Sequence, residues 1–203
     1  HLKRIGPDAE AHGGSAFPLR GAKTSMWEGG LRVPCIMWAP EHIPANTACD
    51  EIASTMDMLP TIAQLAGGKV PTDRVIDGHD LGDLIHGVEG AESKTDAFYY
   101  YGRTELRAVR SGPWKLHLPR LIDQRWQRYS KPEDVFDITR PMLYNLESDV
   151  AESTDVSAQH PNVVNQLLQL AEHARSDIGD IDRIGENARF FDLEPRRPDI
   201  GKN

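Results

Sequence analysis

Residues 21–34 read GAKTSMWEGGLRVP, a stretch in which one lysine stands among glycines and small residues and is followed by an aromatic residue and a carboxylate. Glycine lets a backbone approach a ligand closely, so such a loop can present the ammonium of Lys23 to an anion in a fixed position. A solvated surface lysine would show the same spacing. Lys23 is therefore a candidate anion ligand whose role depends on the rest of the chain.

The residues around this stretch predict a loop, then a strand, then a helix. Residues 1–30 are rich in Gly and polar residues without a sustained period, which indicates a loop. Residues 31–39 form a short apolar run between glycines and a proline, typical of a buried strand in a parallel or mixed sheet. Asp57 is predicted to cap a helix with Pro60 in its first turn, which ends at Gly67.

The second half of the chain has the pattern of an antiparallel sheet covered by a helix. Short aromatic or β-branched runs, separated by Gly, Pro and Asp, occur at residues 98–101, 106–110, 115–118 and 142–146. A Ser-Gly-Pro turn at residues 111–113 predicts a hairpin. Residues 161–178 carry one apolar stripe at helical spacing before Gly179, so we expect a helix that lies across the sheet.

Composition narrows the class of protein. The chain has 203 residues, 39% of them hydrophobic and 27% charged, with a net charge of −8. These values indicate a folded chain with no membrane span, and an acidic protein is a poor partner for nucleic acid. Cys35 and Cys49 are too few for a disulfide scaffold. Because the chain begins at His1 without a targeting signal, we expect a preceding segment.

Residues 21–34 resemble the Gly-x-Lys-x-[Ser/Thr]-x-aromatic-Glu-Gly-Gly-x-Arg-x-Pro stretch of the sulfatases, a family of the alkaline phosphatase-like superfamily. Four further stretches resemble sulfatase motifs in the same order: residues 54–63, 76–81, 107–115 and 143–152. The ordered motifs cover most of the chain from about residue 12 to residue 180. Their order makes a chance resemblance improbable.

The resemblance implies a fold and a division into parts. The fold would be the C-terminal portion of an α/β, alkaline phosphatase-like protein. Residues 1–90 would form the end of the catalytic domain and of its large mixed sheet. Residues 91–180 would form a small antiparallel sheet covered by the C-terminal helix, and residues 181–203 an extended tail.

The resemblance also implies hydrolysis of sulfate esters of the aryl or carbohydrate type, in a periplasmic or secreted protein. In the family a hydrated formylglycine attacks sulfur, and Ca²⁺ with Lys and His side chains holds the sulfate oxygens. Lys23 matches the lysine that contacts the sulfate and the leaving oxygen, where fixed cations stabilise developing charge. His12 lies where related enzymes often place a polar contact to the substrate.

The chain departs from the family pattern at the nucleophile and the metal. No [Cys/Ser]-x-Pro-Ser-Arg motif follows Cys35 or Cys49, and the stretch that begins at Ser111 lacks its Ser and Arg. The Asp-Asn metal pair would precede His1. We therefore predict no metal ligand in this chain and no activity from it alone. Formylglycine and the calcium ligands would lie upstream, in the N-terminal catalytic half of the same protein.

Two other functions stay open from the residues. One is a phosphodiesterase or phosphonate hydrolase of the same superfamily, because a cationic pocket suits any tetrahedral anion. The other is a non-catalytic module that binds sulfated glycans, or a truncated pseudoenzyme. The sequence upstream of His1 would discriminate between them.

Two further clusters have competing interpretations. Asp77, His79 and Asp80 could hold a metal, although adjacent residues in an Asp-Gly turn rarely converge on one ion. Residues 103–131 hold eight basic against two acidic side chains and could face a polyanionic substrate, with Trp126 and Tyr129 stacking on a sugar. In the competing interpretation, the basic side chains of this segment pair with acidic groups elsewhere in the chain.

Overall fold

The computed structural model describes residues 15–121 and 136–189. The chain forms two compact units. The sheet unit comprises residues up to 33 together with residues from 97 onward, and the helical unit comprises residues 34–96. The division of the chain at residue 90 stays a prediction, and in the structure residues 15–33 join the unit that contains the antiparallel sheet.

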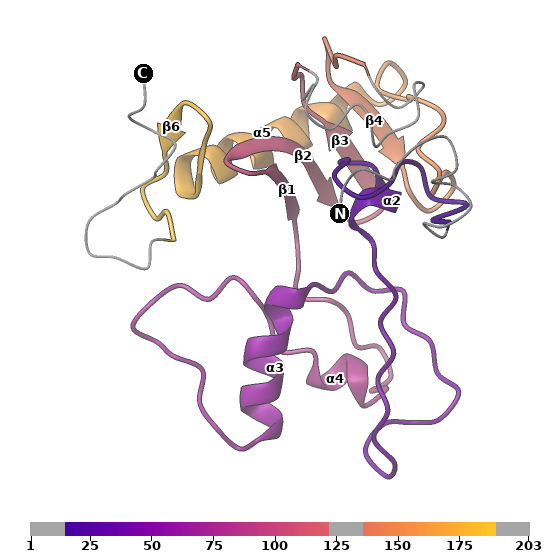
Figure 1. Ribbon diagram of the computed structural model, residues 1–203, viewed down its shortest axis with the longest axis vertical. Coiled ribbons are helices and arrows are strands. Elements are labelled where there is room, and N and C mark those ends of the chain that lie inside the picture. Colours follow the sequence, from indigo (N-terminus) through magenta and orange to yellow (C-terminus); the bar gives the residue numbers. More distant parts are fainter. Residues whose placement is uncertain (1–14, 122–135, 190–203) are drawn as a thin grey trace, which may run out of the picture. The chain divides into compact units, whose positions relative to one another are not determined.

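The sheet unit is built on four antiparallel strands that follow one another in the sheet in chain order (Figure 1). They are β1 Phe98–Gly102, β2 Glu105–Ser111, β3 Trp114–His117 and β4 Met142–Asn145. Gly112, with a φ of 53°, provides the left-handed conformation of the turn between β2 and β3. The strands predicted from short aromatic or β-branched runs, and the hairpin predicted from its turn residues, are thus confirmed.

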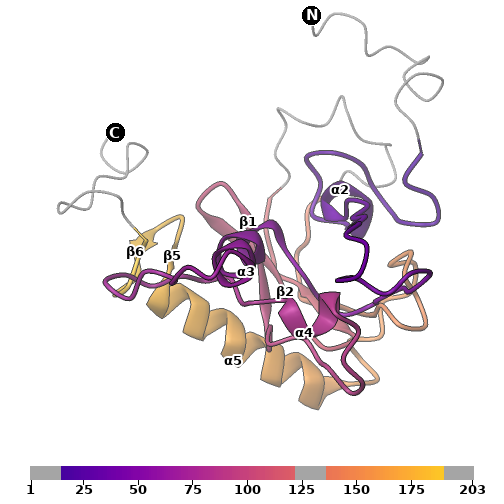
Figure 2. The same cartoon turned by 90° about the horizontal axis from the view of Figure 1, so that it is seen from below.

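Helix α5, Pro161–Asp177, covers this sheet as its apolar stripe predicts (Figure 2). Its buried side chains pack against apolar residues of β2, β3 and β4. The buried core consists of Leu106, Val109, Leu116, Leu118, Leu143, Leu167, Ala171 and Ala174. After α5, β5 Gly179–Asp180 pairs with β6 Arg183–Ile184, so the segment predicted as an extended tail begins with a short hairpin.

A charge introduced on the buried face of α5 should destabilise the sheet unit. Leu167 is 2% exposed, and Leu167→Asp would place an unpaired carboxylate among aliphatic side chains. We expect the free energy of unfolding, measured by urea denaturation, to fall by about 3–5 kcal/mol. Gln169→Asp is the control because Gln169 is exposed on the same helix. Equal losses in the two variants would contradict the proposed packing.

The helical unit contains a 3₁₀ turn η1 Thr55–Asp57, helix α3 Met58–Leu65 and helix α4 Gly82–Ile85. The predicted helix is present with Asp57 at its N-cap position, but the Asp57 side chain makes no capping hydrogen bond to α3. The Ser54 hydroxyl accepts a hydrogen bond from the Met56 N–H at 3.2 Å, and the Asp57 carboxylate accepts the Ser54 N–H at 2.6 Å. This capping box starts η1 at Ser54, and α3 follows it from Met58, directly after Asp57 as predicted.

The strand predicted over residues 31–39 is wrong. Helix α2, Glu28–Leu31, includes Leu31, the first residue of the predicted strand, and residues 32–39 form no strand. Ile36 and Trp38 are 92% and 84% exposed. An apolar run becomes a buried strand only where other strands pair with it, and the described part of the chain offers it none. The apolar face of α3 is exposed in the same way at Leu59, Ile62 and Leu65.

Candidate functional site

Lys23 lies exposed in a tight turn that precedes α2. The Ser25 N–H donates to the Ala22 carbonyl at 3.0 Å and closes the turn. Thr24 has a φ of 83°, a left-handed conformation that β-branched residues rarely adopt. Strain of this kind costs about 1–3 kcal/mol and persists only where the surroundings impose it. The turn that presents Lys23 is therefore held in place by its neighbours.

The two glycines of α2 allow the helix to contact this turn directly. The Gly29 N–H donates to the Arg20 carbonyl at 2.8 Å. A Cβ atom on Gly29 would lie 2.6 Å from the Arg20 carbonyl oxygen, and one on Gly30 would lie 2.4 Å from the Ser25 carbonyl oxygen. Both positions therefore exclude a side chain, which explains the Gly-Gly pair of the motif physically.

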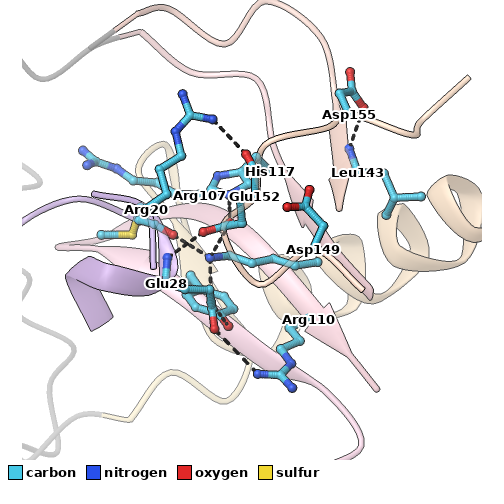
Figure 3. A network of polar contacts seen from close by, with 12 residues as sticks. Arg20, Glu28, Arg107, Arg110, His117, Leu143, Asp149, Glu152 and Asp155 are labelled. Carbon is cyan, nitrogen blue, oxygen red and sulfur yellow. Dashed lines mark hydrogen bonds and ion pairs between the residues drawn. The ribbon is translucent and has the colours of Figure 1, made fainter. Parts of the chain in front are cut away.

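A buried ammonium from β3 contacts the same segment. Lys115 has no exposed surface, and its Nζ donates to the Met26 carbonyl at 2.7 Å and to Glu28 Oε1 at 2.8 Å. The same Nζ lies 2.9 Å from Glu152 Oε1. Figure 3 shows Glu28, Glu152 and His117 within this network of polar contacts. One lysine thus binds two carboxylates and a carbonyl.

Glu152 is the second centre of this network. Its Oε2 accepts the Glu28 N–H at 2.6 Å, and its backbone carbonyl accepts Arg20 Nη1 at 3.0 Å. Its Oε1 also contacts His117 Nε2 at 2.7 Å. The Arg20 guanidinium lies 3.8 Å from the centre of the Trp27 ring, a cation–π arrangement. Glu152 therefore holds both ends of residues 20–28.

Burial and the shared ammonium set the protonation of the two carboxylates. Burial alone would raise the pKa of Glu28, but the neighbouring charges of Lys115 and Arg32 outweigh burial and hold this pKa below its usual range. Burial raises the pKa of Glu152, although the Lys115 charge opposes the shift. Burial also raises the pKa of Tyr100, whose hydroxyl donates to Glu28 Oε1 at 3.1 Å.

His117 is neutral, and its tautomer follows from its contacts. Burial and the nearby charges of Lys115 and Arg120 hold the pKa of His117 well below its usual range. Arg120 Nη2 lies 3.1 Å from His117 Nδ1, and a guanidinium can only donate. Nδ1 is therefore the acceptor, and Nε2–H donates to Glu152.

The His117 ring should remain unprotonated well below pH 6.5 in the folded chain. A ring ¹⁵N titration of the folded chain checks this, with the urea-unfolded chain as the reference. The His117 ring of the unfolded chain takes up a proton near pH 6.5, whereas that of the folded chain does not. The folded chain therefore loses stability relative to the unfolded chain as the pH falls below 6.5. The loss amounts to about 1.4 kcal/mol per pH unit from this residue. A His117 signal that titrates near pH 6.5 in the folded chain would contradict the assignment.

The structure separates the residues singled out from the sequence. Lys23 belongs to the turn beside the network, while His12 lies outside the described residues. In the basic segment Lys115 pairs with acidic residues from elsewhere in the chain, and Arg107 Nε lies 2.7 Å from Glu105. Three basic residues of that segment, and the two aromatic residues considered for stacking on a sugar, also lie outside the described residues: Arg125, Arg128, Lys131, Trp126 and Tyr129.

The Asp-Gly turn at residues 77–78 is tied to the helical unit. The His79 N–H donates to Asp57 Oδ1 at 2.7 Å, and a Cβ atom on Gly78 would lie 2.0 Å from the Met56 carbonyl oxygen. This contact gives the turn a structural role. Within residues 15–121 and 136–189, no three His, Cys, Asp or Glu side chains are grouped so that they could hold a metal ion. The described residues therefore do not fit a calcium site.

Sequence reasoning did not assign Lys115, Glu28 and Glu152 to one site. Each residue stands in one of the quoted motifs, and Lys115 is the one charged residue of the four in β3. A single charge between apolar neighbours in a strand is a usable signal for a buried ion pair. The partners could not be found from spacing, because Glu28 and Glu152 are 124 residues apart.

Comparisons with known proteins agree with this architecture. Residues 1–68 match the family model described as sulfatase, and residues 93–193 match the C-terminal region of aryl-sulfatase. The chain is 41% identical to steryl-sulfatase of Mus musculus over 119 residues, which cover 57% of this chain and 19% of that protein. It is 40% identical to N-acetylgalactosamine-6-sulfatase of Mus musculus over 187 residues, which cover 83% of this chain and 35% of that protein.

A solved sulfatase from Pseudoalteromonas sp. has the same fold, with a TM-score of 0.64, 24% identity, and coverage of 77% of this chain and 32% of that one. The chain belongs to the sulfatase family, and its fold is alkaline phosphatase-like. Within that family it corresponds to the C-terminal region and spans about a fifth to a third of the length of these relatives. No helix of the described residues is long and apolar enough to cross a membrane.

Proposed function

We propose that this chain is the C-terminal part of a sulfuric ester hydrolase and that Lys23 contacts both the sulfate and the leaving oxygen. The observation that carries the proposal is the fixed turn at residues 22–25. Lys115 and Glu152, from two distant motifs, are buried against the segment that contains this turn and pair there with Glu28 of the same segment. A turn held this firmly, with its lysine exposed, suits the binding of an anion.

The proposed chemical role of Lys23 is to stabilise charge on the leaving oxygen. When the S–O bond breaks, negative charge grows on that oxygen, and a fixed ammonium offsets it without reorganising. The formylglycine and the calcium ligands of the proposed enzyme belong to the N-terminal catalytic half of the same protein. His12 is proposed as a polar contact to the substrate, a sulfate ester of the aryl or carbohydrate type.

The exposed apolar residues of the helical unit support the proposal that another part of the same protein packs against this chain. Ile36 and Trp38 stand almost fully exposed in an extended run, and α3 exposes Leu59, Ile62 and Leu65. Leu59, Ile62 and Leu65 lie at helical spacing on one face of α3, and an exposed apolar face of a folded protein marks an interface. We propose that the N-terminal catalytic half of the same protein covers these residues. A periplasmic or secreted location is proposed from the family resemblance.

An assay on an aryl sulfate with calcium tests the proposal. The 203-residue chain alone should show no turnover, whereas the longer protein that includes the upstream half should hydrolyse the ester. Turnover by the chain alone that disappears with Lys23→Ala would contradict the division of labour. A longer protein that cleaves phosphate diesters in preference would support the phosphodiesterase alternative. A longer protein that binds sulfated glycans without turnover would support the non-catalytic one.

A further inference from the structure

We infer that Glu152, together with Lys115, is a positioning residue that sets the location of the Lys23 ammonium in the active site. This inference rests on the proposed function and extends it to residues that touch no substrate. Lys115 and Glu152, with the contacts of their side chains and of the Glu152 backbone carbonyl to residues 20–28, are called the clamp below. The clamp acts on residues 20–28, so its effect on catalysis passes through Lys23.

The contacts of the clamp lie on both sides of the turn. Before the turn, Arg20 donates to the Glu152 carbonyl at 3.0 Å. After the turn, the Met26 carbonyl accepts from Lys115 at 2.7 Å, and the Glu28 N–H donates to Glu152 at 2.6 Å. The segment is therefore fixed on each side of Lys23, and the clamp leaves only the few residues of the turn between its contacts.

The clamp is itself held rigidly. The side chains of Lys115 and Glu152 are fully buried, so neither can adopt another rotamer without losing its partners. The Glu152 carboxylate accepts from the Glu28 N–H, from Lys115 and from His117 at distances between 2.6 and 2.9 Å. Such bonds to charged groups are short and strong. This rigidity also accounts for Thr24, whose strained φ requires imposed surroundings.

A loosened clamp should affect the chemical step more than binding. The leaving oxygen and the ammonium must approach within hydrogen-bond distance in the transition state, and a displacement of about 1 Å costs about 10² in rate. Glu152→Gln keeps the size of the side chain but removes the charge that Lys115 and His117 contact. We therefore expect kcat to fall roughly 10- to 100-fold on a sugar sulfate, with a much smaller change in KM.

A double-mutant cycle in the full-length sulfatase separates positioning from general damage. If Glu152 acts through Lys23, Glu152→Gln in a Lys23→Ala background should lower kcat by less than about threefold. Independent effects would multiply, and such a result would overturn the inference. The matched control is Asp180→Asn, which also neutralises a buried carboxylate, one that pairs with Arg175 at 2.7 Å and accepts the Leu106 N–H. It should leave kcat nearly unchanged.

Hydrogen exchange in the 203-residue chain tests the clamp without any catalysis. Glu152→Gln should speed amide exchange at residues 20–30, whereas Asp180→Asn should not. Unchanged exchange at residues 20–30, or faster exchange with an unchanged kcat, would overturn the inference. A full-length wild-type protein without sulfatase activity would instead refute the proposed function, and the exchange data would still decide whether the clamp holds the turn.

Discussion

Lys23→Ala in a full-length sulfatase that carries this chain is expected to lower kcat about 10²- to 10³-fold, with a smaller rise in KM. The ammonium at the leaving oxygen meets charge that grows only as the S–O bond breaks. Its contribution is therefore larger in the transition state than in the bound substrate. Steady-state kinetics on a sugar sulfate measures both constants. Lys69→Ala, which removes an exposed lysine of the helical unit, is the control.

The leaving group gives this first prediction its sharpest test. A nitrophenolate leaves with little need for neutralisation, so nitrophenyl sulfate should lose less activity than an alkyl or sugar sulfate when Lys23 is replaced. Lys23→Arg should not restore the rate, because a planar guanidinium places its charge differently. Equal losses on both substrates would mean that Lys23 only anchors the sulfate. A fully active Ala variant would remove Lys23 from the site.

Lys115→Met is expected to destabilise the folded chain by about 3–5 kcal/mol at neutral pH. Lys115 is the ammonium shared by Glu28 and Glu152, at 2.8 and 2.9 Å. Without it, two carboxylates lie buried against each other and lose the charge that holds the pKa of Glu28 low. Breaking such a network by removing one partner leaves uncompensated buried charge. Urea denaturation of the 203-residue chain measures the loss.

An exposed ion pair and a measurement at lower pH provide the controls for this second prediction. Arg183→Met removes an exposed partner of Glu172 and should have only a small effect. Acidification should narrow the difference between Lys115→Met and the wild-type chain, because protonation neutralises the two carboxylates that the variant leaves unpaired. An effect of Lys115→Met no larger than that of Arg183→Met, or one that grows in acid, would contradict the buried arrangement.

Much of the sheet unit was predictable because its signals are local. The short aromatic or β-branched runs over 98–118 and the apolar stripe over 161–178 each lie within one or two elements. The strands and the helix that they predict are present in the structure. The same holds for the Ser-Gly-Pro turn of the hairpin. The ordered motifs identified the family, and the family resemblance singled out Lys23.

The wrong strand prediction over residues 31–39 and the exposed face of α3 have a common physical cause. Residues 31–39 and the face of α3 at Leu59, Ile62 and Leu65 carry the apolar pattern of buried elements, yet both are exposed in the structure. The apolar pattern shows which face of an element can be buried, but burial requires another part of the protein that packs against that face. The described chain does not provide such a part, so pattern alone overestimated the core.

The sequence by itself thus determined the strands β1 to β4, the helix α5, the family and the candidate lysine, because each depends on residues close together in the chain. Only the tertiary structure decided that Glu28, Lys115 and Glu152 share one buried site beside that lysine. Opposite charges attract without regard to sequence separation, so the choice among many possible ion pairs is made only when the fold brings particular groups out of water together.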